Sequence, residues 1–234
     1  MKRKLKQRSS VERRVAILVL YTVSLAVQLS FGLIKEARGF SEPDLLNRRI
    51  RPTEIKNQTI DQVLSLLAID YKIPIGIELA DEKLAPGHKI TLNVPETNLK
   101  DFLSSVVAKD TRYNWKLEGG VIHFSPVTGR DALIAALLDT KISHFAFAEG
   151  SSRYSINNDI MNIPEIRAQL VVADVAPMIF LNGASMQRVG KGVALNESGI
   201  TLKELLDQIV LKTEFKRWTL GRWGKDNEFI TLTS

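Results

Sequence analysis

The chain has 234 residues, 44% of them hydrophobic, which is enough for ordinary globular cores in one or two domains. It has no cysteine, so disulfide bonds and thiolate chemistry are excluded, although this does not decide the compartment. The net charge of +6 arises entirely within residues 1–39, and the remainder holds 23 Lys and Arg against 24 Asp and Glu, so the folded part has no overall attraction to nucleic acid.

The N-terminus is typical of an export signal or a membrane anchor. Residues 1–14 are rich in Lys and Arg, and residues 15–34 then run for 20 positions without a charge. Small residues at 37–39 offer a signal-peptidase site, whereas residues 15–34 are just long enough to span a membrane if they are retained. A soluble buried helix is the third interpretation. We expect the remainder of the chain to lie in the periplasm or to be anchored to the inner membrane, outside the cytoplasm.

The first half of the chain alternates strands with two amphipathic helices. Apolar residues at spacings of three and four predict the helices, and alternation predicts the strands. The expected elements, in order, are a strand at 49–56, a helix at 59–71, strands at 74–79 and 89–94, a helix at 99–109, and strands at 113–117 and 121–124. A Pro-Gly turn at 86–87 and a tight Gly-Gly hairpin at 119–120 separate strands.

Part of the first half occurs again 103 residues later. Residues 90–117 align with residues 193–220 without a gap, and nine of these 28 positions are identical, including Trp115 with Trp218. The agreement extends beyond the helix into both flanking strands, so it is more than a similarity between two amphipathic helices. Each helix also has a start signal: Asn98 with Asp101, and the capping box of Thr201 with Glu204.

The second half follows the same order more loosely. The sequence predicts a linker helix at 131–138, a strand at 144–148, a first helix at about 163–172 and a strand at 178–182, with a longer loop at 221–228 in the last hairpin. The fold class is therefore α+β, with two tandem domains of order β-α-β-β-α-β-β, each with two helices on a small sheet. We expect domain one at 45–126, a linker at 127–139 and domain two at 140–234, behind a hydrophobic N-terminal helix within residues 1–39.

The stretch 57–125 resembles a known family. The resemblance rests on the helix at 59–71, the run Ile-Pro-Ile-Gly-Ile-Glu-Leu at 73–79, Lys-Ile-Thr-Leu-Asn-Val at 89–94, Asn-Leu-Lys-Asp-Phe-Leu-Ser-Ser-Val-Val at 98–107, and Gly-Gly before Val-Ile-His-Phe at 121–124. It is similar to the short N-terminal domain of secretins and TonB-dependent transducers (the STN domain) and to the C-terminal domain of membrane-bound anti-sigma regulators. The second half is a degenerate copy of this pattern.

The resemblance implies a module of the cell envelope that binds other proteins, either a signalling partner or copies of itself. It supplies no catalytic residue and does not identify the partner. We therefore expect a non-enzymatic envelope protein that acts by protein–protein interaction in secretion, transport or transenvelope signalling. The alternatives are a sensor module for a small ligand or peptidoglycan, and a cell-wall enzyme of unrecognised type.

The sequence offers no recognisable catalytic, cofactor or metal site. None of His88, His123 and His144 has a second histidine or a carboxylate at ligand spacing, so each is interpreted as structural. The glycine-rich run at 189–192 lacks the first glycine and the final Ser or Thr of a phosphate loop, and it is interpreted as a turn.

The strongest candidate for function is a surface at the C-terminal hairpin. Arg222, Trp223 and Lys225 lie in the loop that only the second copy has, and an aromatic residue beside arginine is typical of interface hot spots. Trp218, the counterpart of Trp115, is expected in the core. A Trp223 folded back onto its own hairpin is the alternative. Stacking of single-stranded nucleic acid on such residues is not expected, because the exported part is nearly neutral. An open sheet edge is a second possible interface.

Overall fold

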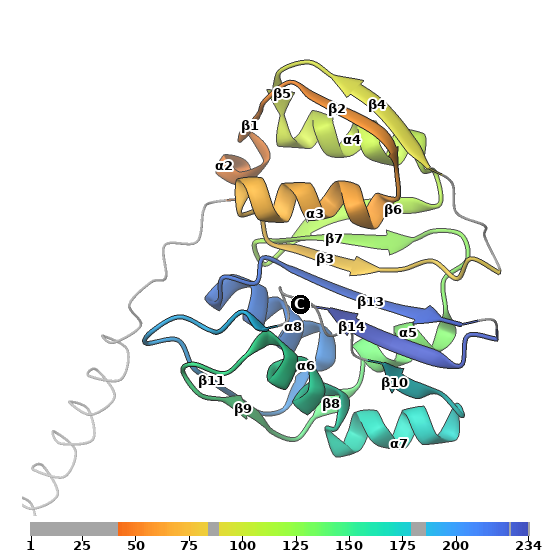
Figure 1. The fold of residues 1–234 in the computed structure, drawn as a ribbon, viewed down its shortest axis with the longest axis vertical. Coiled ribbons are helices and arrows are strands. Elements are labelled where there is room, and N and C mark those ends of the chain that lie inside the picture. The colour runs from red at the N-terminus through yellow and green to blue at the C-terminus, as the bar shows by residue number, and fades with distance from the viewer. Residues whose placement is uncertain (1–41, 84–88, 179–185, 225, 234) are drawn as a thin grey trace, which may run out of the picture. The chain divides into compact units, whose positions relative to one another are not determined.

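The computed structural model describes residues 42–83, 89–178, 186–224 and 226–233, which belong to one compact unit spanning residues 40–234. The helices and the mixed sheet confirm the α+β class (Figure 1). Among these residues no helix is long and apolar enough to cross a membrane. The predicted hydrophobic helix within residues 1–39 and the turn at 86–87 lie outside the described residues.

The elements of the first half agree closely with the prediction. The strand expected at 49–56 is divided in two, and a short helix precedes it. The elements are α2 (Glu42–Leu46), β1 (Arg49–Ile50), β2 (Thr53–Gln58), α3 (Ile60–Tyr71), β3 (Ile75–Glu78), β4 (Ile90–Val94), β5 (Thr97–Asn98), α4 (Leu99–Lys109), β6 (Tyr113–Glu118) and β7 (Val121–Pro126).

The second half contains one helix that the sequence did not indicate, α6. The elements are α5 (Ala132–Leu138), β8 (Lys141–Ile142), β9 (Phe145–Phe147), α6 (Arg153–Met161), α7 (Pro164–Val172), β10 (Ala176–Met178), β11 (Leu195–Glu197), β12 (Ile200–Thr201), α8 (Leu202–Lys212), β13 (Arg217–Trp223) and β14 (Phe229–Thr233). Most of the strand expected at 178–182 lies outside the described residues.

The helix start signals form as the sequence predicts. Thr201 and Glu204 make a reciprocal capping box, in which the Thr201 side chain accepts from the Glu204 N–H and the Glu204 carboxylate accepts from the Thr201 N–H. The Asn98 side chain accepts from the Asp101 N–H at the same position of α4. Both helices bury the predicted stripe, because the residues at matching positions of the repeat are less than 3% exposed (Leu99, Phe102, Leu103 and Val106; Leu202, Leu205, Leu206 and Ile209).

The repeat continues into the topology. In the first half β1 pairs with β5 and β2 with β4, and in the second half β8 pairs with β12 and β9 with β11. The pair Ile55–Leu92 corresponds to Phe147–Leu195. Leu92 and Leu195 are 103 positions apart, but Ile55 and Phe147 are only 92 apart, so the second half has gained 11 residues after β9. The offset of 103 therefore does not extend to the strands before α7, and the inserted residues form α6, which packs on α7 and β14.

The two halves share one sheet. Its strand order is β10-β14-β13-β3-β7-β6, with three strands from each half (Figure 1). The sequence predicted a small sheet in each half, and the structure instead joins them where β13 pairs in parallel with β3. The Ile75 N–H donates to the Lys216 carbonyl at 2.9 Å, and the Leu79 N–H donates to the Leu220 carbonyl at 2.9 Å. We call this strand pair the β13–β3 joint.

The halves follow one another along the sheet in the same order but with strand directions reversed. β3–β7–β6 in the first half corresponds to β10–β14–β13 in the second: in each set the first pair is parallel and the second antiparallel. Because β13 runs parallel to β3, it is antiparallel to its counterpart β6. Such a head-to-tail arrangement uses one edge of each half and leaves β6 and β10 at the ends of the sheet.

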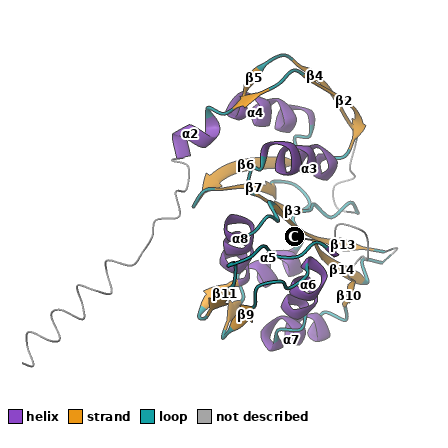
Figure 2. Ribbon diagram, turned by 60° about the vertical axis from the view of Figure 1, so that its left-hand side comes forward, coloured by secondary structure: helices purple, strands orange, loops and turns teal. Residues whose placement is uncertain are grey.

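The two hydrophobic cores lie on opposite faces of the shared sheet. Ile75 and Ile77 of β3 belong to the core that holds α3 and α4, whereas Trp218 and Leu220 of β13 belong to the core of the second half. In Figures 1 and 2, α3 and α4 lie at one end of the molecule and α6, α7 and α8 at the other. All four residues of β3 are buried because neighbours cover both of its faces.

Trp218 is the largest side chain buried in the β13–β3 joint. It is 2% exposed, and its indole Nε1–H donates to Asp207 of α8 at 2.9 Å. The ring lies 5.9 Å from His123 and so close to Gly76 that any Cβ there would come within 3.0 Å of it. The glycine in β3 is therefore required by the tryptophan of the other half.

Charged side chains connect the two halves on both faces of the shared sheet. The Arg217 guanidinium of β13 donates to the Asp61 carboxylate of α3 and to Ser65 Oγ. On the other face Lys203 Nζ lies 3.1 Å from a carboxylate oxygen of Glu118. Hydrogen bonds from Lys116 and Lys203 lower the pKa of Glu118 to about 2.

A further ion pair explains the burial of Glu78 in β3. Arg130, which follows β7, donates to both carboxylate oxygens of Glu78, at 2.7 and 3.1 Å. The two parallel bonds match the planar guanidinium to the carboxylate and allow a carboxylate that is 3% exposed to remain in the sheet.

Candidate functional site

The structure places Arg222 and Trp223 of the predicted surface at the end of β13, in different environments. Trp218 is buried, as expected, and Trp223 is 48% exposed at the end of β13. Lys225 lies outside the described residues. The Trp223 side chain therefore reaches the surface, whereas the Arg222 side chain beside it is bonded to other residues of the protein.

Arg222 is held inside the hairpin by three hydrogen bonds. Its Nε and Nη2 donate to the Asn227 carbonyl, at 2.9 and 2.6 Å, and its Nη1 lies 3.3 Å from a carboxylate oxygen of Asp131. Asp131 is 4% exposed and caps α5 by accepting from the N–H groups of Leu133 and Ile134. Arg222 thus supports the loop and the linker helix.

Trp223 lies at the rim of a cleft of about 610 Å³ between the two halves, which we call the junction cleft. The cleft is formed by the start of α3, the end of β3 with the residues that follow it, the start of β6 and the end of β13. The lining residues are Thr59, Ile60, Asp61, Leu79, Ala80, Glu82, Lys83, Lys89, Arg112, Tyr113, Arg222, Trp223, Gly224 and Asn227.

One side of the junction cleft is formed by the buried side chain of Tyr113. The Tyr113 hydroxyl accepts from the Ala80 N–H at 2.9 Å, and burial raises the pKa of Tyr113 to about 12. Arg112 lies with its guanidinium carbon 5.4 Å from the centre of the Tyr113 ring. The fully buried Asp110 accepts two bonds from Arg112, at 2.9 and 2.8 Å, and raises the pKa of that guanidinium. These groups form a rigid, neutral wall at neutral pH.

The opposite side belongs to the hairpin that carries Trp223. Asn227 Nδ2 donates to Asp81 at 3.0 Å, and Lys83 Nζ lies 3.6 Å from Asp226, so side chains from the first half hold the hairpin loop. Gly224 adopts φ +97°, where a side chain would be strained and would also meet Glu228. The loop geometry therefore fixes the end of β13 and with it Trp223.

The chemistry of the junction cleft is that of a binding surface with an apolar anchor and a charged rim. Four basic and two acidic side chains line it, and Asp61 is already bound by Arg217 and Thr219. Among the basic side chains, Arg112, Arg222 and Lys83 are paired with Asp110, Asp131 and Asp226. A half-exposed indole beside Leu79 and Ile60 can receive an apolar group. Lysine ammonium groups at the rim can pair with carboxylates. The volume falls within the range of small-molecule pockets as well.

The histidines and the glycine-rich run lie elsewhere. His123 is 4% exposed in the β13–β3 joint, His144 contacts Ser198, and His88 lies outside the described residues. Within the part of the chain that the structure describes, no group of three or more His, Asp or Glu side chains could hold a metal ion. Gly192 has φ +77° and donates to Glu149 at 2.8 Å, which confirms a turn in the run at 189–192.

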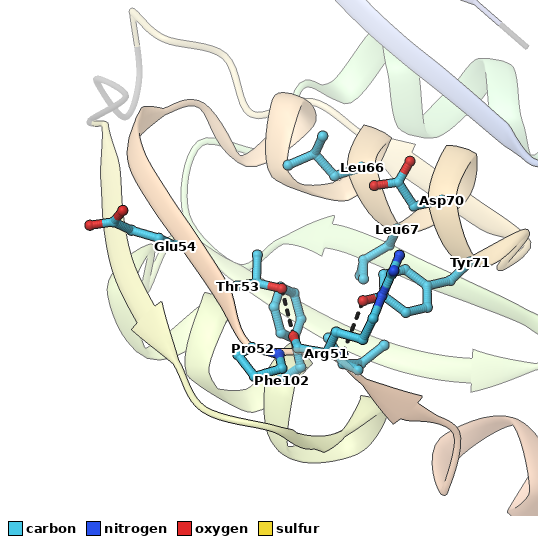
Figure 3. A pocket seen from close by; sticks show the side chains of 10 residues that line it. Arg51, Pro52, Thr53, Glu54, Leu66, Leu67, Asp70, Tyr71 and Phe102 are labelled. Carbon is cyan, nitrogen blue, oxygen red and sulfur yellow. Dashed lines mark hydrogen bonds between the residues drawn. The ribbon is translucent and has the colours of Figure 1, made fainter.

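A smaller groove of about 380 Å³ separates β2 from α3 (Figure 3). Its walls are joined by one bond, in which the Tyr71 hydroxyl accepts from the Arg51 N–H at 3.0 Å. Thr53 Oγ1 donates to the Arg51 carbonyl at 2.7 Å within one wall. Leu66 lines it and is 44% exposed. One signal of this groove is visible in the sequence, since Leu66 is apolar but lies off the buried stripe of α3.

No protein-family model matches the chain, and neither a curated protein nor a solved structure matches it. The STN-like resemblance therefore rests on the sequence pattern alone, and the candidate site rests on the geometry described above.

Proposed function

We propose that this chain is a non-enzymatic cell-envelope protein that binds another protein through the junction cleft, with Trp223 as the principal contact. The observation that carries the proposal is a tryptophan, 48% exposed, at the rim of a cleft to which both halves contribute. Partly exposed tryptophans beside pockets are the side chains most enriched among interface hot spots. The partner segment would present an apolar side chain to Trp223 and carboxylates to Lys83 and Lys89.

The architecture of the proposal is two tandem copies of one STN-like module, the second degenerate. The 103-residue repeat, the equivalent strand pairs and the equivalent helix caps support a common ancestry. The copies are joined along one sheet, so they would present the cleft between them as a single fixed surface. The limits of 45–126 and 140–234 for the modules and 127–139 for the linker stay predictions.

The proposed location is the periplasm or the outer side of the inner membrane. The basic residues of 1–14 followed by 20 uncharged residues support export or anchoring. The choice between a cleaved signal and an anchor through residues 15–34 stays open. A role in secretion, transport or transenvelope signalling is what the resemblance implies for such a module.

The size of the junction cleft favours one second candidate, a sensor that binds a small ligand or a peptidoglycan fragment there. A pocket of several hundred Å³ with an exposed indole is suited to such ligands. The two candidates differ in what contacts Trp223 in the cell, a protein segment or a small molecule.

The deciding experiment is site-specific crosslinking in the native cells. A photo-reactive residue at Glu82, an exposed residue that lines the cleft, should give one discrete protein adduct. The adduct should disappear when Trp223→Ala is added, because the anchor is lost, and it should persist with Val172→Ala, a control at a residue that is 89% exposed on α7. Adducts unaffected by Trp223→Ala would contradict the proposal. The absence of any protein adduct, with a change in Trp223 fluorescence on adding soluble peptidoglycan fragments, would favour the sensor instead.

A further inference from the structure

β6 is an end strand of the sheet, and one side of its backbone is unused by other strands in the described part of the chain. The Ile122 N–H of β7 donates to the Pro74 carbonyl, so Ile122 faces β3 rather than β6. Its partner in the antiparallel register is Leu117. Because bonded and non-bonded pairs alternate in such a ladder, the N–H and C=O groups of Trp115 and Leu117 point away from β7.

The second half shows the same edge with a strand on it. Trp115 and Leu117 correspond to Trp218 and Leu220 at the offset of 103. In β13 these positions face β3, which runs parallel with Gly76 opposite Trp218. β13 and β6 are thus two copies of one edge, of which the structure shows one occupied.

The corresponding residues of the two edges differ in burial, as expected if only one edge is covered by a strand. Trp218 is 2% exposed and Leu220 is fully buried, whereas Trp115 and Leu117 are partly exposed. The Trp115 N–H, which corresponds to a group facing β3 in the joint, donates instead to the side chain of Asn114 at 2.8 Å. Arg217 stands at the position of Asn114 in β13, and its side chain reaches Asp61. The Asn114 side chain therefore accepts the Trp115 N–H, which a strand paired with β6 would otherwise accept.

A second copy of the chain is a poor occupant of this edge. The counterpart of β3 is β10, at the other end of the sheet. The Ala176 N–H donates to the carbonyl of Glu228, the residue before β14, so the residues on either side of Ala176 face outward. Of these, Val175 already donates its N–H to the Leu170 carbonyl, and Pro177 has no N–H. The described part of β10 thus offers no free donor, as is common where an edge is protected against sheet extension.

We propose that the β6 edge binds an extended segment of a different protein, aligned parallel to β6 and hydrogen-bonded to Trp115 and Leu117. The segment would be apolar, with glycine or another small residue opposite Trp115, as Ile75, Gly76 and Ile77 are placed against β13. Main-chain bonds would supply affinity, and the space beneath the indole would select the small residue. This surface differs from the junction cleft, so it does not depend on Trp223.

The test uses the full chain in detergent and a soluble probe, the peptide of residues 72–79 with a lysine tail. Calorimetric titration should show binding, and the Leu117 amide should become protected from hydrogen exchange. A peptide with valine in place of the residue corresponding to Gly76 should not bind, because the side chain collides with the indole.

The chain supplies a matched pair of variants at the edge. Asn114→Ala frees the Trp115 N–H and should tighten peptide binding about three- to tenfold, the effect of one hydrogen bond, whereas Asn114→Asp keeps the acceptor and should not tighten it. Trp223→Ala should leave the titration unchanged, which separates this proposal from the one above. Absence of binding, equal binding of the valine peptide, or a peptide-free dimer that protects Leu117 would overturn the proposal.

Discussion

Replacing Trp218 by alanine is expected to lower the free energy of unfolding by about 3–5 kcal/mol, the range for large aromatic side chains in cores. The indole is 2% exposed and fills the space over Gly76 and beside His123. Its loss also removes the bond from Nε1 to Asp207, which lies at 2.9 Å. The cavity would open in the β13–β3 joint, where it weakens the contact between the halves.

The repeat supplies the control for this substitution. Trp115→Ala removes the same side chain from the same position of the first half, but Trp115 is partly exposed because β6 has no strand beyond it among the described residues. The expected loss is about 1–2 kcal/mol, since less apolar surface is withdrawn from water. Urea-induced unfolding of the two variants measures both values. Equal losses would contradict the account of the joint.

Gly76→Ala is expected to destabilise the protein by about 1–3 kcal/mol, the usual cost of overpacking a core. Gly76 does not adopt a left-handed conformation, so alanine would meet no backbone strain and would on conformational grounds favour a strand. The opposing effect is steric, because the added Cβ would come within 3.0 Å of the Trp218 ring in a strand that is buried on both faces.

Gly190→Ala is the matched control, since a Cβ at Gly190 would meet nothing within 4 Å and its φ is not positive. We expect a change of less than about 0.5 kcal/mol there. Thermal and urea unfolding of both variants provide the comparison. If Gly76→Ala raised the stability instead, the packing of Trp218 against β3 would be wrong.

Local signals were enough to predict most of the first half. The stripe of α4 and its Asn98 cap, and the stripe of α8 with its capping box, depend on residues close in sequence. The structure has α4 at the predicted limits and α8 beginning after the predicted cap. The repeat carried the same information into the second half from β11 onward. The α+β class followed from these elements.

The β13–β3 joint could not be predicted from apolar spacing or helix caps, because these signals involve only residues close in sequence. Ile75 and Ile77 alternate with Gly76 and Glu78, which is typical of a strand with one open face. The structure buries the second face with Trp218 and the Arg130 pair, and both partners come from distant sequence. Pairing between strands of two repeats leaves no local trace beyond the glycine itself.

The inserted helix α6 escaped prediction for a different reason. Residues 151–162 are rich in Ser, Asn and Asp, which are typical of loops. Only Ile156, Ile160 and Met161 contribute apolar side chains to the core among its nine residues, so its stripe is narrow. Ser152 caps the helix through the Ser155 N–H, a signal that is visible only when the helix is already suspected.

The candidate site was predicted in part. Trp223 was selected because the sequence predicted a loop at 221–228 that only the second copy has. The structure instead extends β13 to Trp223 and exposes this residue at the junction cleft. Arg222 was selected by composition, but the buried Asp131 and the Asn227 carbonyl engage it. The cleft itself needs both halves, so residues such as Tyr113 and Lys83 had no sequence signal that linked them to Trp223.

The most direct test of the central claim, that β13 and β6 are one edge in an occupied and a vacant form, is amide hydrogen exchange at Leu220 and Leu117. These residues hold the same position in the two halves, but among the strands that the structure describes, only Leu220 has one facing its amide. The account predicts that Leu220 exchanges only through global unfolding and that Leu117 exchanges orders of magnitude faster. Equal exchange at the two amides, whether both slow or both fast, would contradict it.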